Sequence, residues 1–474
     1  MTSPANTLSF SSSPQPLAPW DSAAYPNYLP HPHRSYRRLL WASLGLTVLL
    51  FVALDRLIPW MSPLMLLFII MVGYMVWLGI QLKRVPATHP QPLVDSELAS
   101  APWVSILVAA HNEESVVTGL LDNLRSLIYT HKEIIVVNDR STDATATVLE
   151  QYVAQLSAEE KSHITLVHRS EGQTPGKSAV LNEALQLAKG DLIAIFDADA
   201  RVATDFLNQL VPYFNETTVA GVQARKQVGD YHRNWLAECQ GVEMTMDAYI
   251  QEGRDTLAGA VEFRGNGQMV CRKALQRVGG WNEATLTDDL DLSTRLHIAG
   301  YTIRFCSQAK VLEESVPQYG GLLRQRRRWG EGSLVRYLDY LRPVFQSPYV
   351  SVRDKADLIA YLIEFLLPIW VVVDAAYLLV LEFWVRDPNH WHLWMTLFAL
   401  PGLGVFFYGL IISSLRRFER HLGWVETLRQ ATVTAFYLVV LWIPVVWWVT
   451  VRLMTDTHKP FDWGKTQHVG MQPA

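Results

Sequence analysis

Long uncharged runs of apolar residues lie near both ends of the chain and predict membrane helices. The four clearest runs are residues 39–54, 57–82, 391–415 and 431–451. Each can cross a hydrocarbon core of about 30 Å, the first of them only just. A fifth run, residues 358–383, is a weaker candidate because Glu364 and Asp374 interrupt it. Acids at membrane depth are costly and normally face the interior of a helix bundle or water.

Basic residues beside these runs predict how the helices are oriented. Arginines precede the first run, and Lys83 and Arg84 follow the second. Because positive charge accumulates on the cytoplasmic side, both ends of this helix pair are predicted to face the cytoplasm. Arginines between the last two runs indicate a cytoplasmic loop there as well. Five spans would place the C-terminal tail outside, whereas its own basic residues favour the inside, so the side of that tail stays open.

Between residues 103 and 304 the pattern changes to short apolar runs that alternate with amphipathic stretches. The predicted strands are residues 104–110, 134–137, 164–167 and 192–196. Helices are predicted between them, for example over residues 113–128 and after the capping sequence Ser141-Thr142-Asp143. Such alternation is typical of an α/β fold with a parallel sheet covered by helices on both faces. The ligand site of such a sheet lies at the carboxyl ends of its strands.

These patterns divide the chain into five parts. Residues 1–33 are rich in Ser, Pro, Asn and His and have no apolar period, so we interpret them as a disordered tail rather than a signal peptide. Residues 34–84 hold two predicted transmembrane helices, and residues 100–340 hold the cytosolic α/β domain. Residues 357–452 hold about three more transmembrane helices, and residues 453–474 form the C-terminal tail.

Composition agrees with a membrane protein. Of the 474 residues, 50% are hydrophobic and 17 are Trp, and the mean hydropathy is +0.10. The net charge of −4 gives no reason to expect a nucleic-acid partner. Only three cysteines occur and none forms a Cys-x-x-Cys pair. This argues against a disulfide framework or a zinc site, and for reduced thiols facing the cytosol.

The stretch IAIFDADA sets two carboxylates one residue apart at the end of a predicted strand. In extended backbone Asp197 and Asp199 point to the same face, where like charges repel unless a cation lies between them. By itself this pattern fits a solvated strand end as well as a metal site. Asp139 ends another predicted strand in the same way, in the stretch IIVVNDRSTD.

A Gly-rich stretch before a predicted helix resembles a phosphate loop but has the wrong spacing. In GQTPGKS three residues separate the glycines, where that loop needs four. Lys177 still opens a helix whose first amide groups could meet a phosphate, although an exposed lysine there is as often without a specific role.

Two stretches contain more charged residues than helix capping explains. Thr287 or Asp288 can cap a helix, yet the stretch TDDLDL contains Asp289 and Asp291 as well, so one of the three acids could be a general base. Arginines 324 and 326–328 form a cationic run beside Trp329. Such a helix could lie on anionic lipid or bind a pyrophosphate, and both can hold on different faces.

Together these stretches resemble a known family. In chain order stand VNDRSTD, FDADA, TDDLDL and QRRRW. The order resembles the D, D, D, Q-x-x-R-W signature of membrane-bound family 2 glycosyltransferases, which include cellulose, chitin, hyaluronan and poly-N-acetylglucosamine synthases. The whole layout is most similar to the cyanobacterial β-monoglucosyldiacylglycerol synthases, including RGNGQMV, GGWNEATLTDDLDLSTRLH and the terminal FDWGKT. The resemblance covers residues 100–340 and the flanking helices, and implies a GT-A-type nucleotide-sugar-binding domain inserted between transmembrane helices.

The resemblance implies roles at the donor site. Asp139 is expected to contact the uridine of a UDP-sugar. Asp197 and Asp199 are expected to hold a divalent metal, Mg²⁺ or alternatively Mn²⁺, on the diphosphate. Lys177 and Arg328 are expected to bind the donor, Arg328 by stabilising the charge that develops on the departing UDP.

It also implies roles at the acceptor site. Asp289 matches the acid of the family's T-E-D triplet, here Thr287-Asp288-Asp289, and is expected to deprotonate the acceptor hydroxyl. Gln325 and Trp329 are expected to line the acceptor entrance. The sequence departs from the family at Asn138, where many relatives have Asp, and at Asp288, where Glu is usual; both departures leave the assigned acids intact.

The expected activity is inverting transfer of glucose from UDP-glucose to diacylglycerol, by a multi-pass membrane protein with its catalytic domain in the cytoplasm. The nearer alternative is a processive polysaccharide synthase. The alternative from a different class is a transporter or membrane scaffold with an α/β module, and the lack of a visible inverted repeat in the sequence argues against it. A glycoside hydrolase would need two carboxylates but neither the arginine cluster nor the metal-like pair.

Overall fold

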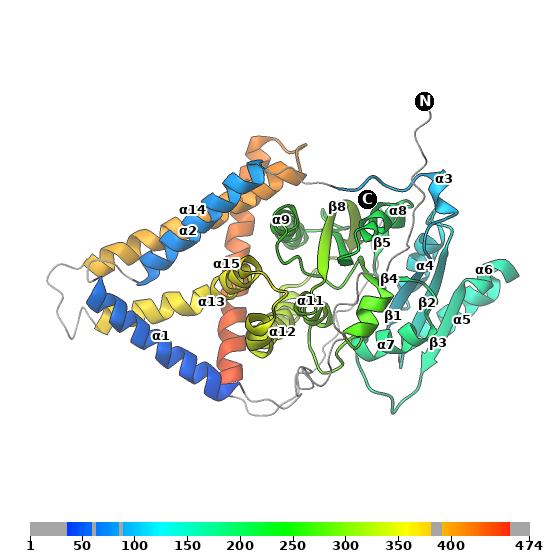
Figure 1. Ribbon diagram of the computed structural model, residues 1–474, viewed down its shortest axis with the longest axis horizontal. Helices are drawn as coiled ribbons and strands as arrows, with labels where there is room; N and C mark the ends of the chain where they lie inside the picture. The colour runs from blue at the N-terminus through cyan, green and yellow to red at the C-terminus, as the bar shows by residue number, and fades with distance from the viewer. Residues whose placement is uncertain (1–35, 59–62, 85–88, 381–390, 456–474) are drawn as a thin grey trace.

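The computed structural model describes residues 36–58, 63–84, 89–380 and 391–455. It has an α/β domain, on the right in Figure 1, and a group of long helices, on the left. The predicted tail over residues 1–33 and most of the predicted C-terminal tail lie outside the described residues.

The α/β domain is built on one eight-stranded sheet. Its strands are β1 (Val104–Ala110), β2 (Lys132–Asp139), β3 (Ile164–Arg169), β4 (Leu192–Asp197), β5 (Arg201–Val202), β6 (Val219–Val228), β7 (Gln268–Cys271) and β8 (Thr302–Glu313). They lie in the order β3-β2-β1-β4-β7-β6-β8-β5. Neighbours pair in parallel at β3/β2, β2/β1, β1/β4 and β6/β8, and antiparallel at β4/β7, β7/β6 and β8/β5. The prediction of an α/β fold with a mostly parallel sheet is confirmed.

Helices cover this sheet on both faces. The helices between residues 95 and 346 are α3 (Asp95–Leu98), α4 (Val117–Arg125), α5 (Thr145–Gln155), α6 (Ala158–Ser162), α7 (Lys177–Leu187), α8 (Phe206–Leu210), the 3₁₀ helix η1 (Val211–Asn215), α9 (Trp235–Thr256), α10 (Arg272–Arg277), α11 (Asp288–Ile298) and α12 (Tyr319–Gln346).

The sheet has a hydrophobic core on each face, which explains why its central strands are nearly continuous apolar runs in the sequence. Along β1, Ile106 and Val108 pack into one core with Leu120 of α4. Leu107, between them, packs into the other core with Val180 of α7. Since side chains alternate between faces, a strand buried on both sides is apolar at most positions. This is why β1, β2 and β4 could be predicted from the sequence.

Strands β6, β7 and β8 were not predicted. Polar residues lie within them and are nonetheless buried: Gln223 and Arg225 in β6, and Gln268 in β7, are at most 3% exposed. Two of these side chains have distant partners: Gln223 Nε2 donates to the carbonyl oxygen of Asn266 at 2.9 Å, and Arg225 Nη2 donates to Glu419 Oε1 at 2.6 Å. Burial of polar groups through such distant partners leaves no local apolar pattern.

The long helices outside the α/β domain are α1 (Arg37–Leu57), α2 (Pro63–Arg84), α13 (Val352–Val380), α14 (Trp391–Phe418) and α15 (Trp424–Thr455). Within the described residues, three helical segments are long and apolar enough to cross a membrane: Arg37–Leu54, Thr396–Phe418 and Trp424–Thr455. The two halves of α13 make a fourth if they count as one bent span, and Leu64–Tyr74 of α2 is a shorter apolar segment. The count of five spans stays a prediction.

Helix α13 is bent by 55° between Ile363 and Phe365. Pro368 lies four residues after the bend point, inside the helix. A proline ring clashes with the carbonyl of the residue four positions earlier and removes a backbone donor, which accounts for a bend at this place. Further along α13, Asp374 is buried and accepts a hydrogen bond from Thr396 Oγ1 of α14 at 2.7 Å.

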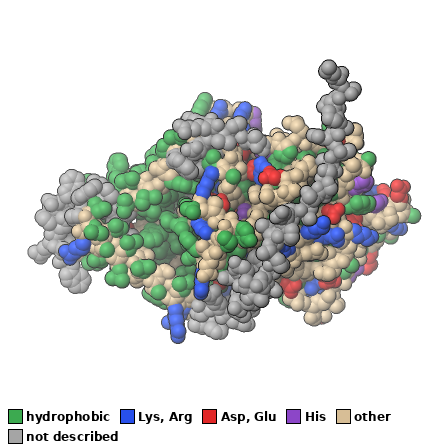
Figure 2. Space-filling model, in the orientation of Figure 1, with side chains coloured by type: hydrophobic (Ala, Val, Ile, Leu, Met, Phe, Trp, Pro, Cys, Tyr) green, Lys and Arg blue, Asp and Glu red, His purple; other side chains and the backbone are tan. Residues whose placement is uncertain are grey.

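Surface chemistry separates the two parts of the molecule. Figure 2 shows hydrophobic side chains gathered over the helices on the left and charged side chains over the α/β domain on the right. Among the outward apolar side chains, Leu49 of α1 and Phe436 of α15 are 66% and 67% exposed. Apolar surface of this extent marks contact with a membrane or a partner. Together with the apolar helix lengths, it indicates a membrane protein.

Candidate active site

Two acids lie where parallel strands end at one edge of the sheet. Asp139 ends β2 and Asp197 ends β4, with β1 paired between these strands. Asp139 is buried, and its Oδ1 accepts hydrogen bonds from Arg140 Nε and Arg169 Nη1, both at 2.8 Å. Burial opposes ionisation of Asp139, but the two guanidinium groups outweigh it and hold its pKa below the usual range.

A lysine meets the aspartate at the end of β4. Lys177 opens α7, and its Nζ donates to Asp197 Oδ1 at 2.5 Å and to the carbonyl oxygen of Gly265 at 3.3 Å. Burial lowers the pKa of Lys177, but the carboxylates of Asp197 and Asp288 outweigh it and raise the pKa above the ordinary value. The ammonium group is therefore charged and held at the acidic edge of the sheet.

Asp199 lies in the turn after β4. It is 5% exposed, and its Oδ2 accepts a hydrogen bond from the backbone N–H of Glu314 at 2.9 Å. The Asp197 side chain is more open, at 39% exposed. Within the described residues no group of three or more His, Cys, Asp or Glu side chains is arranged to hold a metal ion. A metal on this pair would therefore need further oxygen ligands from a substrate or water.

The acidic cluster at the start of α11 separates into two kinds of residue. Asp291 is buried and structural: its Oδ1 accepts from Arg295 Nε at 2.7 Å, and its Oδ2 accepts from Tyr340 and Asn282. Asp288 and Asp289 face a cavity instead. Of the three candidate bases, the geometry therefore leaves two.

Burial and a neighbouring charge perturb Asp289. Burial, and then the carboxylate of Asp288, raise the pKa of Asp289 to about 6. A backbone glycine lies against the same carboxyl group: a Cβ added at Gly265 would lie 3.2 Å from Asp289 Oδ2. Gly265 also has a φ of +80°, which favours glycine. Gly265, in the stretch RGNG, therefore lies beside Asp289 and accepts a hydrogen bond from Lys177, although no local pattern in the sequence indicated it as a site residue.

Helix α12 contributes two arginines, Arg326 and Arg328, to the same cavity, and they have different partners. Arg326 is buried, and its Nη2 donates to Glu243 Oε2 of α9 at 2.7 Å. It also donates to Gln325 Oε1 at 2.5 Å and lies 4.1 Å from the ring centre of Trp329. Arg328 faces the acids: burial lowers its pKa, while Asp288, Asp197 and Asp289 favour its charged form.

All of these predicted residues line one cavity of about 960 Å³. They are Asp139, Lys177, Asp197, Asp199, Asp289, Gln325, Arg328 and Trp329. The cavity is charged where the sheet ends and continues between α13, α14 and α15, where its walls are apolar. The tertiary structure thus brings together side chains that are up to 190 positions apart (139 to 329) in the sequence.

An ion network borders this cavity and was not foreseen. Glu262, buried in the loop before β7, accepts hydrogen bonds from Arg254 of α9 at 3.1 Å and from Arg336 of α12 at 2.6 Å. Arg264, two residues further, donates to Asp247 of α9 at 2.8 Å. Burial opposes the charge on Glu262, but the arginines outweigh it and hold its pKa below the usual range. The partners are distant in sequence, so no spacing could have revealed the network.

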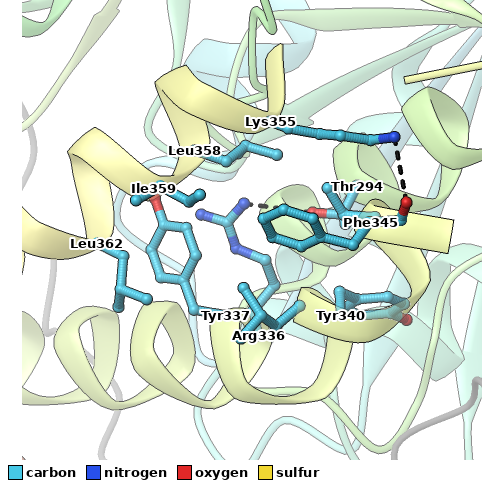
Figure 3. A pocket seen from close by; sticks show the side chains of 11 residues that line it. Thr294, Arg336, Tyr337, Tyr340, Phe345, Lys355, Leu358, Ile359 and Leu362 are labelled. Carbon is cyan, nitrogen blue, oxygen red and sulfur yellow. Dashed lines mark hydrogen bonds between the residues drawn. The ribbon is translucent and has the colours of Figure 1, made fainter. Parts of the chain in front are cut away.

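A much smaller pocket lies between α12 and α13 (Figure 3). Lys355 Nζ donates to the carbonyl oxygen of Phe345 at 3.2 Å, and Arg336 Nη1 donates to Thr294 Oγ1 at 3.2 Å. Its volume of about 20 Å³ suffices for about one water molecule. This junction is therefore a packed contact and offers no room for a sugar or a lipid.

Comparison with known proteins agrees with the geometry. A family model described as Glycosyltransferase like family 2 matches residues 101–332. The Beta-monoglucosyldiacylglycerol synthase of Synechocystis sp. is 35% identical over 413 residues, covering 84% of this chain and 83% of that protein. The protein of the same name from Nostoc sp. is 35% identical over 405 residues, covering 85% and 84%.

More distant proteins match as well. The Poly-beta-1,6-N-acetyl-D-glucosamine synthase of Staphylococcus epidermidis is 25% identical over 361 residues, covering 75% of this chain and 83% of that protein. A solved mannosyltransferase of Pyrobaculum calidifontis, in complex with GDP-Man and Mn2+, aligns with a TM-score of 0.46 at 20% identity, covering 79% of this chain and 98% of that chain. With 35% identity to synthases of this family over most of its length, the chain belongs to the family 2-like glycosyltransferases.

Proposed function

We propose that this protein transfers glucose from UDP-glucose to diacylglycerol with inversion, giving β-monoglucosyldiacylglycerol. The observation that carries the proposal is the single cavity with a charged end at the sheet and an apolar end among α13, α14 and α15. A lipid with a polar hydroxyl and apolar tails matches such a cavity. The names of the two 35% identical relatives support the same donor sugar and acceptor.

At the donor end, positive side chains can balance the charge of a nucleoside diphosphate. Lys177 and Arg328 both lie among the acids of the cavity, where they would bind the diphosphate and stabilise charge on the departing UDP. Asp139 lies at the cavity wall, where its carboxylate, held in place by Arg140 and Arg169, would meet the uracil ring.

The donor set at Asp197 and Asp199 fits a hard divalent cation. Both side chains line the cavity and offer carboxylate oxygens. Mg²⁺ is commonly bound by one or two carboxylates together with substrate phosphates and water, so the two carboxylates at the cavity wall would be enough on the protein side. When bound, the cation would neutralise charge on the diphosphate. Lys177 would supply positive charge beside Asp197 before the donor arrives.

At the acceptor end, Asp289 would take the proton of the attacking hydroxyl. It faces the cavity near Arg328 and Lys177, so the hydroxyl would lie between the base and the donor. Trp329 and Gln325 line the wall beside this point, where an aromatic ring can pack against a sugar. The hydroxyl oxygen would attack the anomeric carbon from the side opposite UDP, which converts an α-linked donor into a β-linked product.

The raised pKa of Asp289 predicts an acidic limb in the rate profile. A general base works only when deprotonated, so kcat/KM should fall about tenfold per pH unit on the acidic side of a pKa of about 6. Asp288→Asn removes a negative neighbour that raises this pKa, so the limb should move to lower pH. Initial rates of UDP release from pH 4.5 to 8 test this. An unchanged limb in Asp288→Asn contradicts the assignment.

Product analysis tests the proposed reaction as a whole. Purified protein in phosphatidylcholine vesicles with dioleoylglycerol and radiolabelled UDP-glucose should yield a chloroform-soluble lipid, identified by thin-layer chromatography and mass spectrometry as monohexosyl dioleoylglycerol. UDP-galactose and UDP-N-acetylglucosamine serve as donor controls. An insoluble or secreted polymer without this lipid contradicts the proposal and favours a polysaccharide synthase.

The polysaccharide alternative has less support. The polysaccharide synthases among the relatives match at 24% to 28% identity, against 35% for the glucolipid synthases. A polymer would need a polar path across the membrane helices, whereas the cavity walls contributed by α13, α14 and α15 are formed by apolar and aromatic side chains and one glycine. The proposal places the α/β domain on the cytoplasmic side of a multi-pass membrane protein.

A further inference from the structure

The part of the cavity between the long helices forms an apolar chamber. We define this apolar chamber by Leu367 and Val371 of α13, Leu403 and Phe407 of α14, and Leu438 and Val446 of α15. None of these six side chains carries a polar group. A concave apolar site of this kind binds apolar ligands by excluding water from both surfaces.

Partly exposed residues of α13 and α15 line the chamber. Val372 of α13, and Val439 and Ile443 of α15, line the cavity and are also 44%, 55% and 40% exposed. These exposed lining residues favour an opening of the cavity between α13 and α15. Both helices have the length and composition of membrane spans, α13 if its bent halves count as one. The opening therefore faces the hydrocarbon core if these helices span the membrane.

The ion pair of Arg326 and Glu243 lies between the apolar chamber and the reaction site. Trp442 of α15 lines the cavity, and its Nε1 donates to Glu243 Oε1 at 2.8 Å. Tyr437 of α15 donates to Glu243 Oε2 at 2.8 Å, and Arg326 donates to both oxygens. Because the charge on Glu243 is compensated, this group can border an apolar space at little cost. Beyond it lie Trp329 and the acids.

We propose that the two acyl chains of the acceptor lie in the apolar chamber and enter it from the bilayer core between α13 and α15. The glycerol would then stop at the Glu243–Trp442 boundary, with its free hydroxyl directed towards Asp289. This inference rests on the proposed function, because it assumes a diacylglycerol acceptor. It explains how a lipid reaches a cytoplasmic base without leaving the membrane.

Neighbouring valines on α15 supply a matched test. Val439 lines the cavity, whereas Val440 is 39% exposed and does not line it. In Val439→Trp the larger ring fills the opening, so the KM for dioleoylglycerol in phosphatidylcholine vesicles should rise about tenfold or more. The KM for UDP-glucose and the turnover of dihexanoylglycerol, whose chains fill little of the chamber, should stay within about twofold. Val440→Trp places the same ring outside the cavity and should behave as the unchanged protein.

Crosslinking gives a second measurement that needs no variant. A diacylglycerol with a diazirine in the distal half of one acyl chain should label peptides from residues 438–446 on irradiation. Excess dioleoylglycerol should displace this label, while labelling of outward positions such as Leu49 persists. If dioleoylglycerol does not displace the label at residues 438–446, the proposal that acyl chains bind specifically in the apolar chamber is wrong.

The outcomes separate this inference from the proposed function. If Val439→Trp and Val440→Trp have the same KM for dioleoylglycerol in a protein that makes the glucolipid, the proposal that the acyl chains lie in the apolar chamber is wrong. The proposed function is then unaffected. Absence of glucolipid from the unchanged protein overturns the proposed function itself, and the inference with it. A loss confined to Val439→Trp and to the long-chain acceptor supports both.

Discussion

Asp289→Asn is expected to lower kcat for glucosyl transfer by about 10²–10⁴-fold while the affinity for UDP-glucose stays near normal. The amide keeps the size of the side chain and can still accept from the backbone N–H of Leu290, which donates to Asp289 Oδ1 at 2.8 Å. It cannot take a proton from the acceptor hydroxyl. Steady-state rates of UDP release, together with calorimetric titration of UDP-glucose, measure the two effects separately.

Asp288→Asn is the matched control for this prediction. Asp288 lines the same cavity, lies beside the same Lys177 and Arg328, and stands one residue away. If Asp289 is the base, Asp288→Asn should keep most of its turnover at neutral pH. Near-normal turnover in Asp289→Asn, combined with a large loss in Asp288→Asn, would assign the base to Asp288. Asp291 is no candidate, since its carboxylate is buried against Arg295, Tyr340 and Asn282.

Removing a carboxylate from the predicted metal pair is expected to lower the activity strongly and to weaken the binding of Mg²⁺. Asp199→Asn is a better variant than alanine here, because the amide oxygen can still accept from the backbone N–H of Glu314. Alanine would leave that buried donor unpaired, which costs about 1–3 kcal/mol of stability. Loss of one anionic oxygen at the cation should raise the Mg²⁺ concentration needed for half-maximal rate at least about tenfold.

Asp191→Asn controls for loss of a negative charge near the same strand. Asp191 stands just before β4, at the end opposite Asp197, and is exposed. It should leave the Mg²⁺ titration unchanged, and the unchanged protein should lose activity in EDTA and regain it with excess Mg²⁺ or Mn²⁺. Full activity of the unchanged protein in EDTA contradicts a metal at Asp197 and Asp199.

Much of the candidate site could be predicted because its acids stand at the ends of strands or the start of a helix. Strand β4 is a run of apolar residues that ends at Asp197, and α11 begins at Asp288 beside Asp289. Local patterns of this kind reflect the two periods of side-chain direction, 2 in strands and 3.6 in helices. The carboxyl-end location then follows from the parallel order of β2, β1 and β4.

The partners of these acids could not be predicted. Lys177 is 20 residues from Asp197, and Glu243 is 83 residues from Arg326. Arg326 and Arg328 both line the cavity, and which of them faces the acids depends on the rotation of α12 against α9 and α15. Only the packed structure shows that Arg326 is paired with Glu243 while Arg328 is directed towards the acids.

By itself the sequence determined the α/β class, the strands β1 to β4, the apolar helices at both ends and the acids at the strand ends. These features depend on residues that are neighbours in the chain, so their periodic patterns can be recognised in the sequence. The tertiary structure alone decided that β7 runs antiparallel between β4 and β6, and that Glu262 gathers Arg254 and Arg336. It alone joined the charged site to the apolar chamber. The physical reason is that burial and pairing between distant segments set the free energy of these contacts, and no local spacing records them.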